Sequence, residues 1–159
     1  MEFDIRADGH PVKLSWTVGG SGTGFLALPA SDGLVHNGAQ LFGNFTPQLP
    51  IGTPNGFNAL SWYDLKENGG NGDRIIDAND KIFPYLRVWL DDNHDGICQE
   101  SELHTLPDVG IVAISLDYRL VARTDQFGNA FRFQAKVNPN VRGQLGIGRL
   151  AYDVFLNVP

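Results

Sequence analysis

The twelve residues 91–102 place oxygen-bearing side chains at a spacing that suits a hard cation. Counted from Asp91 as position 1, side-chain oxygens stand at positions 1, 3, 5, 9 and 12, glycine stands at position 6, and position 7 can offer its backbone carbonyl. These residues are Asp91, Asn93, Asp95, Gly96, Ile97, Gln99 and Glu102. Because Ca²⁺ takes six to eight oxygen ligands at about 2.3–2.6 Å, the spacing predicts a calcium site.

We name residues 91–102 the second loop, because a related segment precedes them in the chain. The second loop fills every position of the EF-hand calcium pattern, D-x-[DN]-x-[DN]-G-x5-E. Without a cation, Asp91, Asp95 and Glu102 would repel one another and raise one another's pKa. The alternative interpretation is a solvated polar turn, which has to explain seven matching positions by coincidence. We therefore expect one bound Ca²⁺ here.

An imperfect copy of the pattern precedes it, in residues 64–80, which we name the first loop. Its matches at positions 3, 5, 7, 9 and 12 are Asn71, Asp73, Ile75, Asp77 and Asp80. Arg74 stands where glycine is expected, and position 1 falls on Gly69, which has no side chain. The sequence predicts that Asp64 supplies the missing ligand while 65–70 bulge out. A second Ca²⁺ is expected here, with a vacant or weak site as the alternative.

A helix is predicted between the two loops. From Asp80 to Leu90 the apolar residues fall on one helical face, and Pro84 should kink the helix or start a new turn. A shorter helix is predicted over 100–105, ending before Pro107. The first of these would join the two calcium loops in one unit.

Short apolar or alternating runs predict strands elsewhere. They cover residues 12–18, 25–28, 41–45, 111–121, 130–137 and 150–157, with a hairpin turn at Gly128-Asn129 and a proline-rich loop over 45–60. The expected fold class is α+β, mainly an antiparallel β sheet with a small helical insertion carrying paired EF-hand-type calcium loops. A single domain is expected over 1–159, β-rich in 1–60 and 107–159, with the insertion at about 61–106.

Composition narrows the function. A net charge of −6 over 159 residues argues against nucleic acid as a partner. Membrane insertion is not expected, because no apolar run approaches the roughly 20 residues that a membrane helix needs. Cys98 is the only cysteine, so no internal disulfide can form, and at position 8 of the second loop it should be a buried thiol. The N-terminus lacks a secretory apolar segment, so we expect part of a longer precursor if the protein acts outside the cell.

Other chemistry has little support. The four histidines are scattered without a zinc motif, and the serines lack a nucleophile-elbow context. A pair of carboxylates for glycoside hydrolysis could come only from separate acids such as Asp117, Asp125 and Asp153, which are expected to be solvated. We therefore expect no catalytic residues and no enzyme activity.

Residues 71–118 resemble the calcium-binding segment of large bacterial secreted or surface proteins, where EF-hand-type loops of the kind used by dockerins lie beside repeats-in-toxin regions. The flanks 41–47 (LFGNFTP) and 123–137 (RTDQFGNAFRFQAKV) are similar to that group as well. The resemblance implies an extracellular or cell-surface calcium-dependent structural module, with other domains of the parent protein or a glycan as further partners. A dockerin-like recognition module for protein or carbohydrate is the alternative, and a hydrolase is a weaker one.

Overall fold

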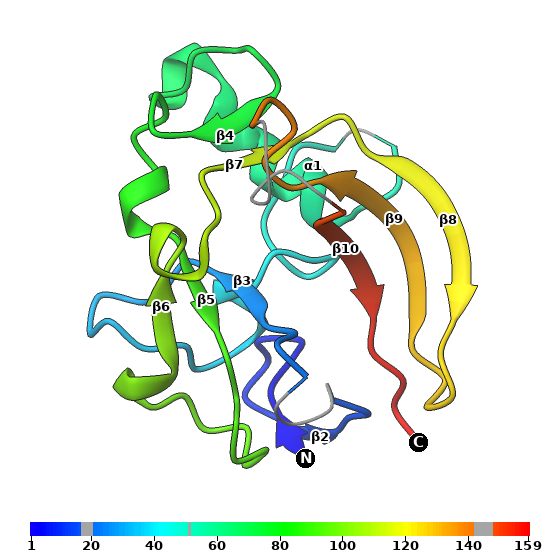
Figure 1. Cartoon of the computed structure of the whole chain (residues 1–159). Coiled ribbons are helices and arrows are strands. Elements are labelled where there is room, and N and C mark those ends of the chain that lie inside the picture. The colour runs from blue at the N-terminus through cyan, green and yellow to red at the C-terminus, as the bar shows by residue number, and fades with distance from the viewer. Residues whose placement is uncertain (17–20, 51, 142–147) are drawn as a thin grey trace.

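The computed structural model describes residues 1–16, 21–50, 52–141 and 148–159. Within them the chain forms small antiparallel sheets joined by long loops (Figure 1). β1 (Glu2–Phe3) pairs with β2 (Val12–Lys13), and β4 (Ile75–Asp77) pairs with β7 (Ala113–Ser115). A three-stranded sheet has the order β3 (Phe25–Ala27), β5 (Arg87–Trp89) and β6 (Leu103–Thr105). Another has the order β10 (Leu150–Phe155), β9 (Ala130–Lys136) and β8 (Arg119–Thr124).

The antiparallel β part of the predicted fold class agrees with the structure, but the helical insertion is wrong. The segment 80–90 contains a 3-10 turn at Phe83–Tyr85 and then strand β5. Pro84 has no N–H for a helical bond, and the Arg87–Trp89 run pairs with β3 on one side and β6 on the other. Segment 100–105 is likewise a 3-10 turn, Glu100–Glu102, followed by β6. No helix carrying paired EF-hand loops exists in the described residues.

The second loop is consequently the connection of a hairpin. Trp89 at the end of β5 faces Leu103 at the start of β6, and Leu90 N donates to Glu102 O at 2.9 Å. The loop's two ends are therefore held together by a strand ladder, which replaces the flanking helices that the sequence pattern predicts.

The one α-helix among the described residues, α1 (Gly56–Ser61), lies inside the predicted loop 45–60. Asn55 caps it, because its side-chain oxygen accepts from Asn58 N at 2.8 Å. A 3-10 turn, Trp62–Asp64, continues directly from α1, so Asp64 stands at the end of this helical run. The expected strand 41–45 is also absent; only Leu41 forms an isolated bridge, with Ala27.

The remaining strands differ from expectation mostly in extent. The predicted strand 12–18 is ordered as a strand only at Val12–Lys13, and residues 17 and 18 lie outside the described residues. The run 111–121 divides into β7 and β8. The predicted strands 25–28, 130–137 and 150–157 correspond to β3, β9 and β10, and the turn of the β8–β9 hairpin contains Gly128 at φ 84°.

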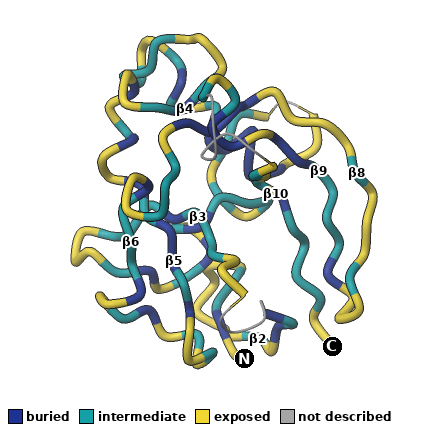
Figure 2. Tube along the Cα trace, in the orientation of Figure 1, coloured by how far each residue is buried: buried dark blue, intermediate teal, exposed yellow. Residues whose placement is uncertain are grey.

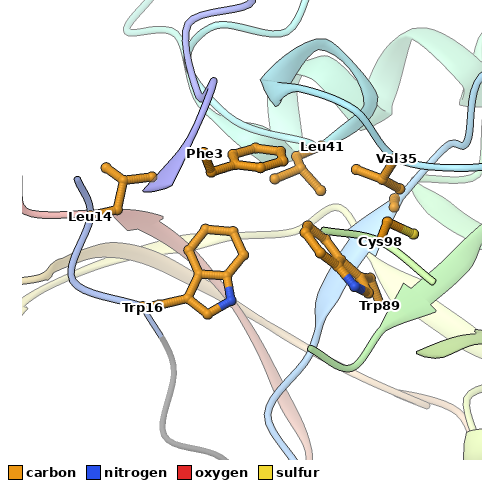
Figure 3. Packing of buried hydrophobic residues seen from close by; sticks show 8 residues of the cluster. Phe3, Leu14, Trp16, Val35, Leu41, Trp89 and Cys98 are labelled. Carbon is orange, nitrogen blue, oxygen red and sulfur yellow. The ribbon is translucent and has the colours of Figure 1, made fainter. Parts of the chain in front are cut away.

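Two hydrophobic clusters form the core, and β5 contributes to both. The first contains Phe3, Leu14, Trp16, Ala27, Val35, Leu41, Trp89 and Cys98 (Figure 3). The second contains Leu60, Ile76, Phe83, Leu86, Val88, Leu106, Ile114 and Leu116. Successive residues of a strand point to opposite faces, so Val88 and Trp89 enter different clusters. Strand β5 thereby joins the two halves of the core.

Burial is lowest along β8, at the outer edge of the β8–β9–β10 sheet (Figure 2). This sheet is tied to α1 by Asp153 of β10, whose Oδ1 accepts from Gly56 N at 2.7 Å. In the described part of the chain, no helix has the length and apolar character required to cross a membrane.

Candidate metal centre

The ends of the second loop bury two of its carboxylates. Asp91 is 5% exposed and Glu102 is 7% exposed. Asp91 Oδ2 accepts from Gly96 N at 3.1 Å across the loop, where Gly96 has a φ of 73°. Glu102 Oε2 accepts from Gln99 N at 3.2 Å and from the indole Nε1 of Trp89, also at 3.2 Å. The loop is thus closed by its first and last acidic residues.

The middle of the second loop is organised around Asp95. Its Oδ1 accepts from Ile97 N at 2.7 Å, and its Oδ2 accepts from the side-chain amides of Asn93 at 2.9 Å and Gln99 at 3.0 Å. The hydrogen bond from Ile97 is the first of the causes that lower the pKa of Asp95. Asp95 is therefore held as a carboxylate by the loop's own donors.

The pKa of Asp91 shifts in the opposite direction from that of Asp95. Its Oδ1 is buried and has no hydrogen-bond partner among the described residues. Burial raises the pKa of Asp91, and repulsion from Glu102 and Asp95 adds to the rise. Glu102 and Asp95 therefore lie near enough to Asp91 to act on its carboxyl.

Most of the hydrogen bonds of the second loop recur in the first loop, although the bond from Gln99 Nε2 does not, because Asp77 stands at that position. Asp64 Oδ2 accepts from Arg74 N at 2.9 Å, as Asp91 Oδ2 does from Gly96 N. Asn71 Nδ2 donates to Asp73 Oδ2 at 2.9 Å, and Ile75 N donates to Asp73 Oδ1 at 2.9 Å. The loop closes with Asp77 N donating to Asp80 Oδ2 at 2.9 Å, which matches the Gln99–Glu102 bond.

Asp64 reaches this position because 65–70 fold outward. A 3-10 turn at Lys66–Asn68 forms the bulge, and a Cβ on Gly70 would lie 2.2 Å from the carbonyl carbon of Asp64. Only glycine permits that approach. Arg74 takes the left-handed conformation that glycine takes in the second loop, with a φ of 66°, which is strained for arginine.

Asp80 matches Asp91 in lacking a partner for one oxygen. Its Oδ1 is buried without a hydrogen bond in the described part of the chain. Burial raises the pKa of Asp80, with further repulsion from Asp64 and Asp77. Each loop therefore holds one buried carboxylate oxygen that a bound cation would satisfy.

The predicted ligands do not, however, form a closed shell. Within the described residues no three His, Cys, Asp or Glu side chains come together as a metal-binding group. Asp73 and Asp95 turn toward neighbouring amides, Asp77 Oδ1 accepts from Asn79 N at 2.8 Å, and Ile97 is 65% exposed. Still, the donors along both loops are all oxygens, and the unpaired oxygens of Asp80 and Asp91 suit a hard divalent ion.

Other acids that the sequence singles out stay apart. Asp117 forms an exposed ion pair with Arg74 at 3.6 Å, and Asp125 closes the β8–β9 turn by accepting from Phe127 N and Asn129 N. Asp153 is 4% exposed rather than solvated, and burial raises its pKa. No hydrogen bond or ion pair joins these three carboxylates.

Two features of the site carry no signal in the sequence. Trp89 donates to Glu102 although it lies outside the loop pattern. Cys98 is buried, as position 8 predicts, but its neighbours in the first cluster include Phe3 and Leu14 from the far N-terminus.

Comparison with known proteins places most of the chain in one family. Residues 1–148 match the SPM domain. Over 132 residues, 83% of the chain, the sequence is 38% identical to the "Iron-regulated protein FrpA" of Neisseria meningitidis serogroup C. The matched region is 11% of that protein, so the chain spans only a small part of the curated relative's length.

Proposed function

The chain belongs to the SPM domain family, and for this member we propose a calcium-binding structural role within a longer bacterial extracellular or surface protein. Ca²⁺ at the two loops would stabilise a fold in which the two-stranded sheets are too short to be stable alone. The described strands of the two-stranded sheets have only two or three residues. The longer relative supports placement within a larger protein.

One observation carries the proposal: each loop contains a buried carboxylate oxygen without a hydrogen-bond partner among the described residues, on Asp80 at position 12 of the first loop and on Asp91 at position 1 of the second. Leaving such an oxygen unpaired costs about 1–3 kcal/mol. In each loop, a bound divalent ion would satisfy the unpaired oxygen. It would also turn the repulsion among the neighbouring carboxylates into attraction to the ion. Amide and backbone oxygens would complete the shell after Asp73 and Asp95 release their amide partners.

The proposed gain in stability follows from mass action. Extracellular calcium sites work at about 10⁻⁴–10⁻³ M. At a calcium concentration of about 100 times the dissociation constant, one site adds about 2.7 kcal/mol to the free energy of unfolding. For a domain of this size that corresponds to a rise in Tm of roughly 5–11 °C.

Calorimetric melting in chelator, in Ca²⁺ and in Mg²⁺ tests the proposal, together with a calcium titration that gives the stoichiometry. We expect Tm to rise with Ca²⁺ concentration, a smaller effect of Mg²⁺, and two bound ions. An identical Tm in chelator and in 10 mM Ca²⁺ would overturn it.

A further inference from the structure

The second loop contacts the start of the chain directly. At Gly96 an added Cβ would lie 2.0 Å from Met1 Cε and 2.7 Å from the carbonyl oxygen of Glu2. The turn of the loop at Gly96 therefore packs closely against Met1 and strand β1. Strand β1 is also held by a two-residue ladder to β2 and by Leu14 N donating to Met1 O at 2.8 Å. Directly after β1, Asp4 forms a bridge with Asn37, and its carbonyl accepts from Gly38 N at 2.8 Å.

The same loop and the N-terminal segment share the first hydrophobic cluster. Figure 3 shows Phe3 and Trp16 facing Trp89, with Cys98 of the second loop beside it. Ring centroids of Phe3 and Trp89 are 5.6 Å apart, and those of Trp16 and Trp89 are also 5.6 Å apart. A hairpin with two-residue strands is not stable by itself. Residues 1–16 are therefore attached by this packing together with backbone bonds to other segments, such as Ser15 N donating to Asn157 O at 2.9 Å.

Trp89 connects the cluster to the loop's last acidic residue. The Trp89 side chain is fully buried, and its Nε1 donates to Glu102 Oε2 at 3.2 Å. Glu102 is the residue expected to close the calcium shell with both oxygens. A change in the position of that carboxylate therefore moves a hydrogen-bond partner of the indole around which Phe3 and Trp16 pack.

We propose that calcium at the second loop controls the docking of the N-terminal hairpin, residues 1–16, on the body of the protein. This inference rests on the proposed calcium binding. Without the ion, repulsion among Asp91, Asp95 and Glu102 opens the loop, and Gly96 and Cys98 lose their contacts with the hairpin. With the ion, the loop presents a fixed surface to it. The coupling is reciprocal, so the docked hairpin tightens calcium binding at the second loop.

Hydrogen exchange followed by mass spectrometry on the whole chain tests this, with and without Ca²⁺, well below the calcium-free Tm. We expect Ca²⁺ to slow exchange in residues 1–16 at least tenfold, with little change in β9 and β10. If Ca²⁺ binds and raises Tm but exchange in 1–16 is unchanged, this inference is wrong while the proposed function stands. Equal slowing in all peptides also contradicts it, because calcium would then act on the whole fold.

The substitution Trp89→Phe tests whether the hydrogen bond from the indole to Glu102 couples the second loop to the hairpin. It removes the N–H donor and keeps an aromatic ring. We expect two ions still to bind, while the calcium-dependent slowing in residues 1–16 falls severalfold. Trp62→Phe is the matched control, because Trp62 is exposed and outside both buried clusters. If Ca²⁺ slows exchange in residues 1–16 as much in Trp89→Phe as in the unchanged protein, this hydrogen bond does not carry the coupling.

Reciprocity is tested from the other side by Phe3→Ala. We expect calcium affinity to fall about tenfold at the second loop and to stay unchanged at the first loop, measured by two-site calorimetric titration. An equal fall at both loops, or none at either, would show that the hairpin and the second loop are not coupled.

Discussion

At the scale of single residues, one difference between the two loops is the last acid, which is Glu102 in the second loop and Asp80 in the first. Glu102→Gln replaces one carboxylate oxygen by an amide and keeps the side chain's size. We expect the second loop to lose at least tenfold in calcium affinity while the first loop still binds, as read from titration stoichiometry. Glu100→Gln is the control, because Glu100 is the exposed neighbour at a non-ligand position. Unchanged stoichiometry and affinity in Glu102→Gln would contradict the ligand assignment.

Arg74 is a second residue-level test, because it holds a left-handed conformation at the position of Gly96. Arg74→Gly should relieve strain of about 1–2 kcal/mol and remove a positive charge from a proposed cation site. We expect a higher Tm and tighter calcium binding at the first loop. Arg74→Ala separates the effects, since it removes the charge and keeps the strain. A lower Tm for the glycine variant than for the alanine variant would refute the strain argument.

The carboxyl of Asp153 gives a pH dependence. Its folded-state pKa is raised above the ordinary value by burial, with Arg132 acting against the rise. The folded protein therefore binds the proton more tightly, so this group's stabilisation is present at low pH and is lost as pH rises through the folded pKa. Asp153→Asn can still accept from Gly56 N, so we expect it to raise the free energy of unfolding at pH 7 by about 1 kcal/mol. The gain should vanish near pH 3.5 in paired melting curves; a gain independent of pH would exclude ionisation as its cause.

At the scale of elements, whether a short segment becomes a strand or a helix depends on the partners it contacts in the folded chain. Part of the predicted helix 80–90 becomes β5 because it pairs with β6 across the second loop and with β3, which lies far earlier in the chain. Helix α1 forms where three prolines predict a loop, because Asn55 caps it and Phe57, Ala59 and Leu60 are buried. Element identity here follows tertiary contacts more than periodicity.

The cap of α1 gives an element-level prediction. Asn55→Ala removes the bond to Asn58 N and should lower the free energy of unfolding by about 1–2 kcal/mol. Because the helical run ends at Asp64, we expect weaker calcium binding at the first loop and unchanged binding at the second. Asn140→Ala, at an exposed turn position, is the control. Equal weakening at both loops would show that α1 has no particular relation to the first loop.

At the scale of the whole molecule, charge is distributed very unevenly. Residues 1–118 contain 16 of the 18 acids and six of the 12 bases, a net of 6 − 16 = −10, and 119–159 contain the other two acids and six bases, a net of 6 − 2 = +4. The repulsion among the carboxylates of the first and second loops should be screened by salt. We expect Tm in chelator to rise between 20 and 500 mM NaCl, and the rise to shrink in saturating Ca²⁺. A salt effect of equal size in both conditions would contradict calcium neutralisation of these loops.

The sequence by itself determined the local structure that depends only on residues close together in the chain. The loop hydrogen bonds of Asp73 and Asp95 join residues two apart, and the replacement of Gly69 by Asp64 follows from an insertion of a few residues. Tertiary structure decided the rest. It made residues 87–89 a strand, buried Asp153 against Gly56 from 97 residues away, and set Trp89 between Glu102 and Phe3. The physical reason is range: backbone turns and Asx bonds close within a few residues, whereas burial and strand pairing depend on partners that only the folded chain brings together.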